Sequence, residues 1–105
     1  MRETHDFDSF EFNPPRIENG KILFFFHDDD AQKISLCGDF NDWQANKNNF
    51  KKQPSGFWQV EIKMLPPGKY RYKLVVDDKR WTEDASNGLK EADGFGGFNS
   101  ILYVQ

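Results

Sequence analysis

Two tryptophans occupy positions where a side chain of that size is not expected. Trp43 ends the turn "CGDFNDW", whose glycine, aspartates and asparagine are residues of exposed bends. Its indole either folds back under the turn into the core or is presented to a ligand. The polar neighbours favour presentation, because binding side chains are often carried on turns of a rigid scaffold. A displayed indole would offer a flat, electron-rich face for stacking.

Trp81 follows the turn "VDDKRW", and one residue of register decides whether it is buried. If the loop has three residues, Trp81 pairs with Val75 and shares a face with Lys73, because strand side chains alternate. If the loop has two residues, Trp81 faces Leu74, among the core side chains. The core is the default place for a tryptophan, but the face of Leu74 already has ample apolar volume.

Short strands are the elements that must position these residues. Segments rich in strand formers recur between turn signals, and no segment keeps a helical period. "KILFFFH" has apolar residues at both odd and even positions, as expected for a strand covered on two sides. In "KISLCG" and "YRYKLVV" apolar and polar residues alternate. "ASNGLKEADGFGG" is predicted to be a flexible loop, and "NSILYV" a closing strand. The pattern predicts an all-β sandwich or barrel with four aromatic core residues, Phe24, Trp58, Tyr72 and Phe98.

A single domain is expected. The chain has 105 residues, which is enough for one hydrophobic core and too few for two. Residues 16–105 are predicted to form this domain. Residues 1–15, in which three phenylalanines precede Pro14 and Pro15, form either an edge strand or a loose arm.

Composition disfavours several classes of partner. The net charge of −3 and the lack of interleaved basic and aromatic residues argue against a nucleic-acid-binding surface. No apolar run approaches the ~20 residues that span a bilayer, and the first ten residues lack a secretion signal. The lone Cys37, expected to be a half-buried strand residue, fits a reducing compartment. A cytoplasmic location is therefore expected.

Neither a catalytic centre nor a metal or cofactor site is expected. The sequence has no nucleophile elbow and no phosphate-cradling glycine loop. His5 and His27 lack metal-ligand spacing, and residues 28–30, three consecutive aspartates, lack the alternating spacing of a calcium loop. Acidic residues are numerous enough to supply a carboxylate pair, but a sandwich of this size has no deep cleft. The chain is therefore not expected to be an enzyme.

Three segments, "SLCGDFNDW", "LPPGKYRYKLVVDDKRW" and "DGFGGFNSILYV", together resemble the glycogen-binding modules of carbohydrate-binding family 48. Such modules occur in the β subunit of AMP-activated protein kinase and at the front of glycogen branching and starch debranching enzymes of glycoside hydrolase family 13. The resemblance covers about residues 22–104 and implies an immunoglobulin-like (early set) β-sandwich.

The resemblance also implies a site for α-1,4-glucan. Trp43 and Trp81 match two tryptophans that stack on glucose rings, and Lys73 and Asn99 match side chains that hydrogen-bond sugar hydroxyls. Phe95 occupies the place of a bulky loop residue that packs against the glucan. Glucose rings suit such a site, because their C–H patches stack on an indole and their hydroxyls both donate and accept hydrogen bonds.

The chain departs from the family pattern in three places. The hairpin "VDDKRW" is one residue longer than the usual turn, and Ala85 stands where the family often has proline. "WQVEIKMLPPG" is also one residue long, as a β-bulge would make it.

Two functions from different classes follow. The first is non-catalytic binding of glycogen, starch or maltooligosaccharide, which predicts that cyclodextrin or maltoheptaose quenches tryptophan fluorescence. The second is a protein-interaction module that docks onto a glucan-metabolising enzyme or kinase complex, since sandwiches with unpaired edges dock neighbours readily. Co-purification of such an enzyme without sugar binding would favour the second.

Overall fold

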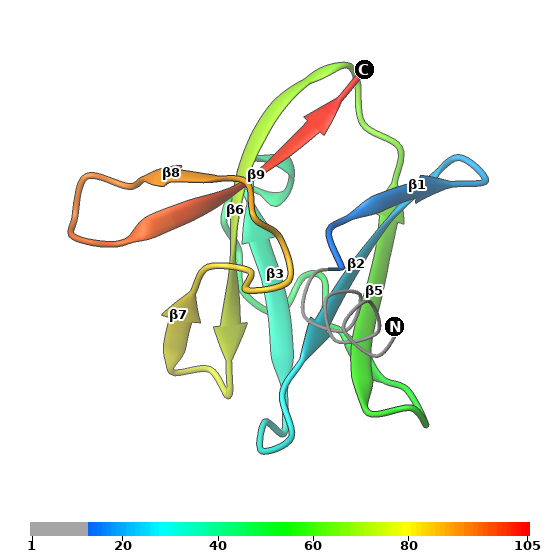
Figure 1. Ribbon diagram of the computed structural model, residues 1–105, viewed down its shortest axis with the longest axis vertical. Coiled ribbons are helices and arrows are strands. Elements are labelled where there is room, and N and C mark those ends of the chain that lie inside the picture. The colour runs from blue at the N-terminus through cyan, green and yellow to red at the C-terminus, as the bar shows by residue number, and fades with distance from the viewer. Residues whose placement is uncertain (1–12) are drawn as a thin grey trace, which may run out of the picture.

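The computed structural model describes residues 13–105, which fold as two antiparallel sheets packed face to face (Figure 1). The elements of this part of the chain are β1 (Arg16–Glu18), β2 (Lys21–His27), β3 (Ile34–Gly38), the 3-10 turn η1 (Asp39–Asn41), β4 (Lys51–Lys52), β5 (Phe57–Lys63), β6 (Gly68–Val76), β7 (Arg80–Thr82), β8 (Lys90–Ala92) and β9 (Phe98–Val104). Sheet A has the order β1-β2-β5-β4, and sheet B has the order β3-β6-β9-β8, with β7 pairing with β6. The predicted immunoglobulin-like β-sandwich is confirmed.

The core lies between the two sheets and is built by the alternating strands. On β6 the side chains of Tyr72, Leu74 and Val76 face inward, as predicted from the alternation of "YRYKLVV". The ring of Phe24 on β2 packs edge-on against Tyr72, with the ring centroids 5.1 Å apart. Every residue from position 22 to position 26 is buried, which confirms a strand covered on both sides.

Three local expectations are wrong. Phe98 is 41% exposed instead of lying in the core, because it follows the hairpin tip where β9 extends beyond the sandwich. The predicted flexible loop contains β8, which pairs with β9 from Ala92 to Lys90. The predicted β-bulge is absent from β5, whose pairing with β2 is unbroken from Phe57 to Lys63, so the extra residue lies in the linker 64–67.

The arm or edge strand predicted for residues 1–15 lies outside the described residues, apart from its last three positions. There the backbone amide of Asn13 donates a hydrogen bond to the carbonyl oxygen of Ser86 at 2.8 Å. Between residues 13 and 105 no helix has the length and apolar character needed to cross a membrane.

A buried polar cluster joins strands of sheet B on its core side. The Tyr72 hydroxyl donates to Asp84 Oδ2 at 2.7 Å, and Asn87 Nδ2 donates to that hydroxyl at 3.0 Å. The amide of Asp84 donates to Ser100 Oγ at 2.7 Å, which ties the segment after β7 to β9. Burial raises the pKa of Asp84 to about 6, although the hydrogen bonds from Tyr72 and the Ser86 amide oppose that rise. The cluster therefore fixes β6, β9 and the end of β7 relative to one another.

The Asp84 carboxyl predicts that stability declines as the pH rises from about 4 to about 6. Its pKa is 3.8 without burial and about 6 in the fold, so the native state binds more protons than the unfolded state in that window. The free energy of unfolding should fall there by on the order of 2–3 kcal/mol. Urea denaturation across this pH range measures the slope, and Asp84→Asn should flatten it. A slope that is unchanged in the variant would contradict the assignment to Asp84.

Candidate functional site

The turn after β3 is built around Gly38 and Asn41. Gly38 pairs with Tyr72, and a Cβ at this position would lie 2.6 Å from the carbonyl oxygen of Arg71 and 2.8 Å from the Cβ of Tyr72. The buried Asn41 side chain accepts a hydrogen bond from the Gly38 amide at 3.0 Å and donates one to the carbonyl oxygen of Leu36 at 2.8 Å. These contacts fix the point at which β3 ends and the chain reverses.

Trp43 is held at the β3 edge of sheet B by two hydrogen bonds. Its amide donates to the carbonyl oxygen of Gly38 and its Nε1 to Asp39 Oδ1, both at 3.0 Å. The second oxygen of Asp39 accepts from the Arg71 amide at 2.8 Å, so one carboxylate ties the indole to β6. Asp42 and Trp43 have φ of 58° and 57°, a left-handed conformation that is uncommon for a bulky residue and concentrates at functional sites. The half-buried ring is not part of the core cluster.

The hairpin that carries Trp81 has a three-residue loop. Asp77 and Asp78 both adopt positive φ, 55° and 59°, and Asp77 Oδ1 accepts two backbone amides of the segment before β3. The register therefore pairs Val75 with Trp81, as predicted for the longer loop. The Trp81 side chain lies on the outer face of sheet B and is 49% exposed.

Lys73 and Asn99 lie on the same outer face. Lys73 is two residues before the position opposite Trp81, so the two side chains share a face. The pairing of Tyr72 with Ser100 continues by one residue to bring Asn99 beside Lys73. Within residues 13–105 the side-chain amide of Asn99 has no hydrogen-bond partner, and it is partly exposed.

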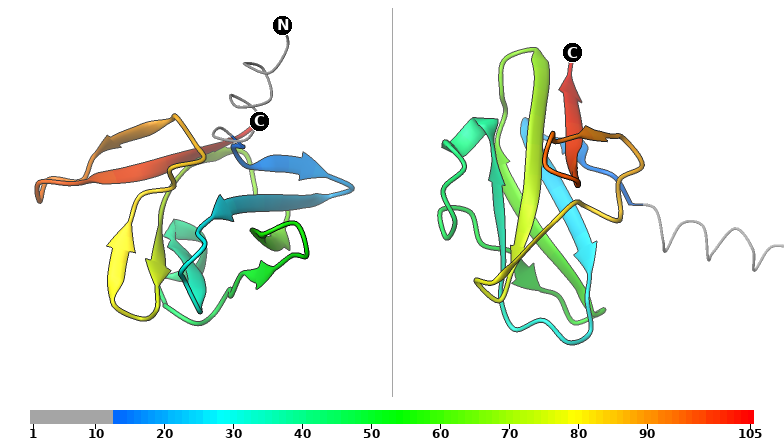
Figure 2. Two further views of the ribbon diagram at one scale, coloured as in Figure 1. Left: turned by 60° about the horizontal axis from the view of Figure 1, so that its bottom comes forward. Right: turned by 90° about the vertical axis from the view of Figure 1, so that its left-hand side faces the viewer.

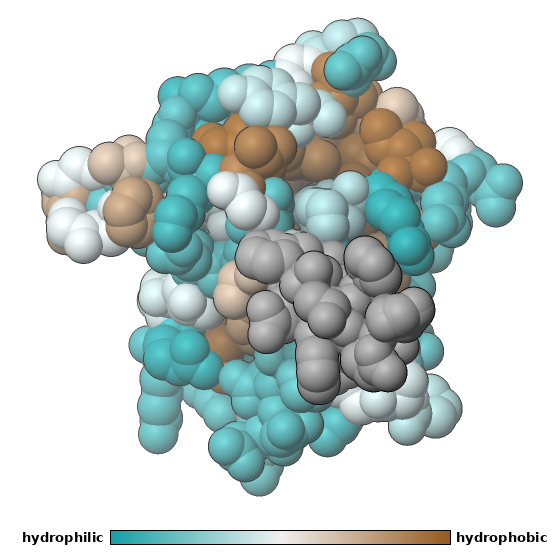
Figure 3. Space-filling view, viewed as in Figure 1, coloured by the Kyte–Doolittle hydropathy of each residue, from teal (hydrophilic) through white to brown (hydrophobic). Residues whose placement is uncertain are grey.

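Phe95 lies at the tip of the β8–β9 hairpin and is 93% exposed. The glycines on either side of it have φ of 86° and 89°, a conformation that only glycine adopts readily. Asp93 closes the tip, since its Oδ1 accepts the amides of Phe95 at 2.7 Å and Gly97 at 3.1 Å. The other oxygen of Asp93 accepts from Lys73 Nζ at 2.7 Å. In Figure 3 this tip projects at the left of the molecule and is coloured mainly white to light brown, between the two ends of the hydropathy scale.

The cations on the outer face of β6 are paired with acids of β8 and the tip. Lys69 Nζ lies 2.7 Å from one oxygen of Glu91, and Arg71 Nε donates to the other. Lys69 and Arg71 together lower the pKa of Glu91. The Lys73 ammonium, helped by the two loop amides, lowers the pKa of Asp93 to about 2. The face is therefore rich in charged groups and carries little net charge.

All five predicted site residues belong to sheet B or to its loops. The right-hand view of Figure 2 looks onto the outer face, where the turn after β3, the strand β7 and the β8–β9 hairpin border β6. These segments carry Trp43, Trp81 and Phe95, whereas Lys73 and Asn99 come from β6 and β9. Two indoles thus lie at opposite edges of β6, with the lysine on the strand between them.

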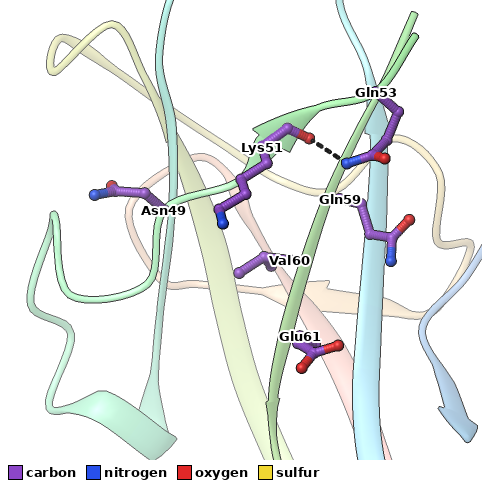
Figure 4. A pocket seen from close by; sticks show the side chains of 6 residues that line it. All are labelled: Asn49, Lys51, Gln53, Gln59, Val60 and Glu61. Atoms are coloured by element: carbon purple, nitrogen blue, oxygen red, sulfur yellow. Dashed lines mark hydrogen bonds between the residues drawn. The ribbon is translucent and has the colours of Figure 1, made fainter. Parts of the chain in front are cut away.

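A hollow of about 410 Å³ lies elsewhere, on sheet A (Figure 4). It is lined by Asn49, Lys51, Gln53, Gln59, Val60 and Glu61. In Figure 4 Asn49 and Lys51 point to one side of β5, and Gln53 and Gln59 point to the other. These polar groups do not converge on one ligand position, and the hollow includes none of the predicted residues.

The sequence of the chain matches that of a known protein family. Residues 9–90 match the sequence profile of carbohydrate-binding module 48, the isoamylase N-terminal domain. The chain belongs to this family. The match includes Trp43, Lys73 and Trp81 and ends before Phe95 and Asn99, whose positions at the hairpin tip and on the outer face come from the structure.

Curated relatives of this family-48 module are 1,4-alpha-glucan branching enzymes. One from Rhizobium johnstonii is 40% identical over 53 residues, which cover 50% of this chain and 7% of the relative. One from Fusobacterium nucleatum is 31% identical over 69 residues (63% and 11%), and one from Burkholderia lata 30% over 76 residues (70% and 10%). The chain thus spans about a tenth of the length of these relatives.

Three acids that organise the outer face of the family-48 module were not predicted from the sequence, namely Asp39, Glu91 and Asp93. A signal for Asp93 was present, because an aspartate two residues before the exposed phenylalanine and followed by glycines is typical of an Asx turn. A second signal was the spacing of Glu91 and Asp93, two residues apart, which matches the two-residue spacing of the cations on β6.

Proposed function

We propose that this module binds α-1,4-glucan on the outer face of sheet B and catalyses no reaction. In the proposed mode Trp43 and Trp81 stack on glucose rings, Lys73 and Asn99 hydrogen-bond the hydroxyls, and Phe95 packs over the chain. The observation that carries the proposal is the hairpin register, which leaves Trp81 half exposed on the same face as Lys73. Membership of family 48 and the similarity to the three glucan branching enzymes described above support the same substrate.

The chemistry of the face suits an uncharged polymer. Stacking of an aromatic side chain on a flat ring contributes roughly 1–3 kcal/mol, by analogy with nucleic-acid bases. Lys73 uses one of its three N–H groups on Asp93, which leaves two donors for sugar hydroxyls. Asn99 can both donate and accept, and its amide has no competing partner between residues 13 and 105. An open face also lets a long chain lie across it.

The hydrogen bonds and ion pairs of the acidic residues on this face support a non-catalytic role. Glycoside hydrolysis needs two carboxyl groups that flank the scissile bond and are free to move protons. On this face Asp39 holds Trp43 and the Arg71 amide, and Asp93 holds Lys73 and two loop amides. Glu91 is likewise bound by two cations. These carboxylates serve as structural acceptors in the proposed function.

Calorimetric titration with a sugar panel tests the proposal. We expect saturable binding of maltoheptaose and β-cyclodextrin at up to millimolar concentration, and no binding of cellohexaose, whose glucose units are joined with a different geometry. Absence of heat with both α-linked sugars at millimolar concentration would contradict glucan binding. Equal affinity for cellohexaose would contradict the proposed preference for the α-1,4 linkage.

A further inference from the structure

Asp93 lies in a glycine-rich hairpin tip, yet its side chain is held by several hydrogen bonds. Its two carboxylate oxygens accept three hydrogen bonds, from the amides of Phe95 and Gly97 and from Lys73 Nζ. Its own amide donates to the carbonyl oxygen of Gly97 at 3.1 Å. The side chains of Asp93 and Lys73 are 11% and 18% exposed, which makes theirs the most shielded ion pair within residues 13–105.

The carboxylate is the main restraint on the tip of the hairpin. Phe95 projects into solvent and provides no packing of its own, and its glycine neighbours leave the backbone flexible. Gly97 passes so close to the ion pair that a Cβ there would lie 3.1 Å from Asp93 Oδ2 and 3.8 Å from Lys73 Nζ. Loss of the side-chain acceptor at position 93 would therefore leave the amides of Phe95 and Gly97 without their partner and free the tip.

The same carboxylate removes the positive charge of the site. Lys69 and Arg71, which share the outer face with Lys73, are both bound by Glu91. Lys73 is neutralised by Asp93 at 2.7 Å. A phosphate group on a sugar would then find no unpaired cation on this strand and would approach two carboxylates, and like charges brought together are strongly unfavourable.

We propose that Asp93 is a positioning and specificity residue of this site, which orders the Phe95 tip by accepting its loop amides and, by neutralising Lys73, makes the face select uncharged glucan over phosphorylated glucan. The inference rests on the proposed glucan binding. Asp93 acts through other residues and does not itself contact the sugar, because its oxygens already accept hydrogen bonds from Lys73 and from the loop amides.

Two substitutions separate the two roles. In Asp93→Asn the side-chain oxygen can still accept the amides of Phe95 and Gly97, but the NH₂ group faces the Lys73 ammonium and cannot neutralise it. In Asp93→Ala both roles are lost. Glu18→Gln is the matched control, because it removes one negative charge from an exposed position on β1 of sheet A.

The test compares the affinities for maltoheptaose and for maltoheptaose carrying one phosphate monoester. The wild type and Glu18→Gln should prefer the neutral sugar by about tenfold or more. Asp93→Asn should bind neutral maltoheptaose within about threefold of the wild type and lose that preference, with salt-sensitive binding of the phosphorylated sugar. Asp93→Ala should bind neutral maltoheptaose about tenfold more weakly, because the tip no longer covers the chain. The same preference in Asp93→Asn as in the wild type would overturn the specificity role.

A measurement without sugar keeps the inference separable from glucan binding. The ¹H–¹⁵N heteronuclear NOE of the Phe95 and Gly97 amides should be high in the wild type and in Asp93→Asn, and should fall in Asp93→Ala. Unchanged values in Asp93→Ala would overturn the positioning role even if the wild type binds maltoheptaose. A fall in Asp93→Ala, together with no binding of either sugar by the wild type, would support the positioning of the tip and contradict the proposed function.

Discussion

Replacement of Trp81 by alanine is expected to weaken the binding of maltoheptaose by about 5- to 150-fold, the equivalent of roughly 1–3 kcal/mol of lost stacking. The indole is 49% exposed and lies on the outer face opposite Val75. The substitution should therefore lower the free energy of unfolding by only about 1 kcal/mol. Calorimetric titration of the folded variant measures the loss, and thermal unfolding confirms that the fold is kept.

Two variants control this result. Trp81→Phe keeps an aromatic face and should recover part of the affinity. Tyr103→Ala removes another exposed aromatic, 54% exposed, from the far end of the outer face opposite Lys69, and should leave the affinity unchanged. If Trp81→Ala binds maltoheptaose as tightly as Tyr103→Ala does, Trp81 is not a stacking residue.

The other indole allows a cleaner substitution than alanine. Trp43 has φ of 57°, which an alanine would adopt at a cost and which a glycine adopts freely. Trp43→Gly therefore removes the ring and its hydrogen bond to Asp39 without straining the turn. Its effect on affinity should match that of Trp81→Ala.

Replacement of Gly38 by alanine should have the largest effect on stability. The added Cβ would lie 2.6 Å from the carbonyl oxygen of Arg71, 2.8 Å from the Cβ of Tyr72 and 2.9 Å from the ring of Phe40. The first two atoms belong to the paired strand β6 and cannot move without breaking its ladder. Overpacking of this kind costs about 3 kcal/mol or more, which lowers the melting temperature of a domain of this size by about 10–20 °C.

Gly88→Ala is the matched control for this substitution. A Cβ at Gly88 meets no atom within 4 Å, and its backbone does not require positive φ. Its melting temperature should stay within a few degrees of the wild type or rise slightly, because alanine restricts the unfolded chain. Equal melting temperatures for the two variants would contradict the tight packing of Gly38 against β6.

The hairpin between β6 and β7 shows how far the sequence could predict the fold. Alternation of apolar residues was enough to identify β6 and its inward face. It left two registers open for Trp81, because register depends on the loop conformation. The longer loop is selected by Asp77 and Asp78 in left-handed conformations and by the amides that Asp77 accepts from the segment before β3. Those contacts join positions far apart in the sequence, so periodicity alone could not reveal them.

The outer face, too, could be predicted only in part from the sequence. The residue types of the predicted contacts were visible in the sequence and its family resemblance, whereas their supporting acids were not. Lys73 was predicted as a sugar contact, but its ion pair with Asp93, twenty residues later in the chain, was not. The strand β8 was not predicted, because "KEA" has no strand-like pattern. It forms through its pairing with β9.

Glucan binding by the two indoles can be observed directly by NMR. The chain has three tryptophans, and each gives one indole Nε1–H signal in a ¹H–¹⁵N spectrum. On titration with maltoheptaose we expect the signals of Trp43 and Trp81 to shift together. The signal of Trp58, which is 6% exposed and donates to the carbonyl oxygen of Asp28, should not shift. If the signals of Trp43 and Trp81 stay in place at millimolar sugar, the outer face of sheet B is not a glucan-binding surface.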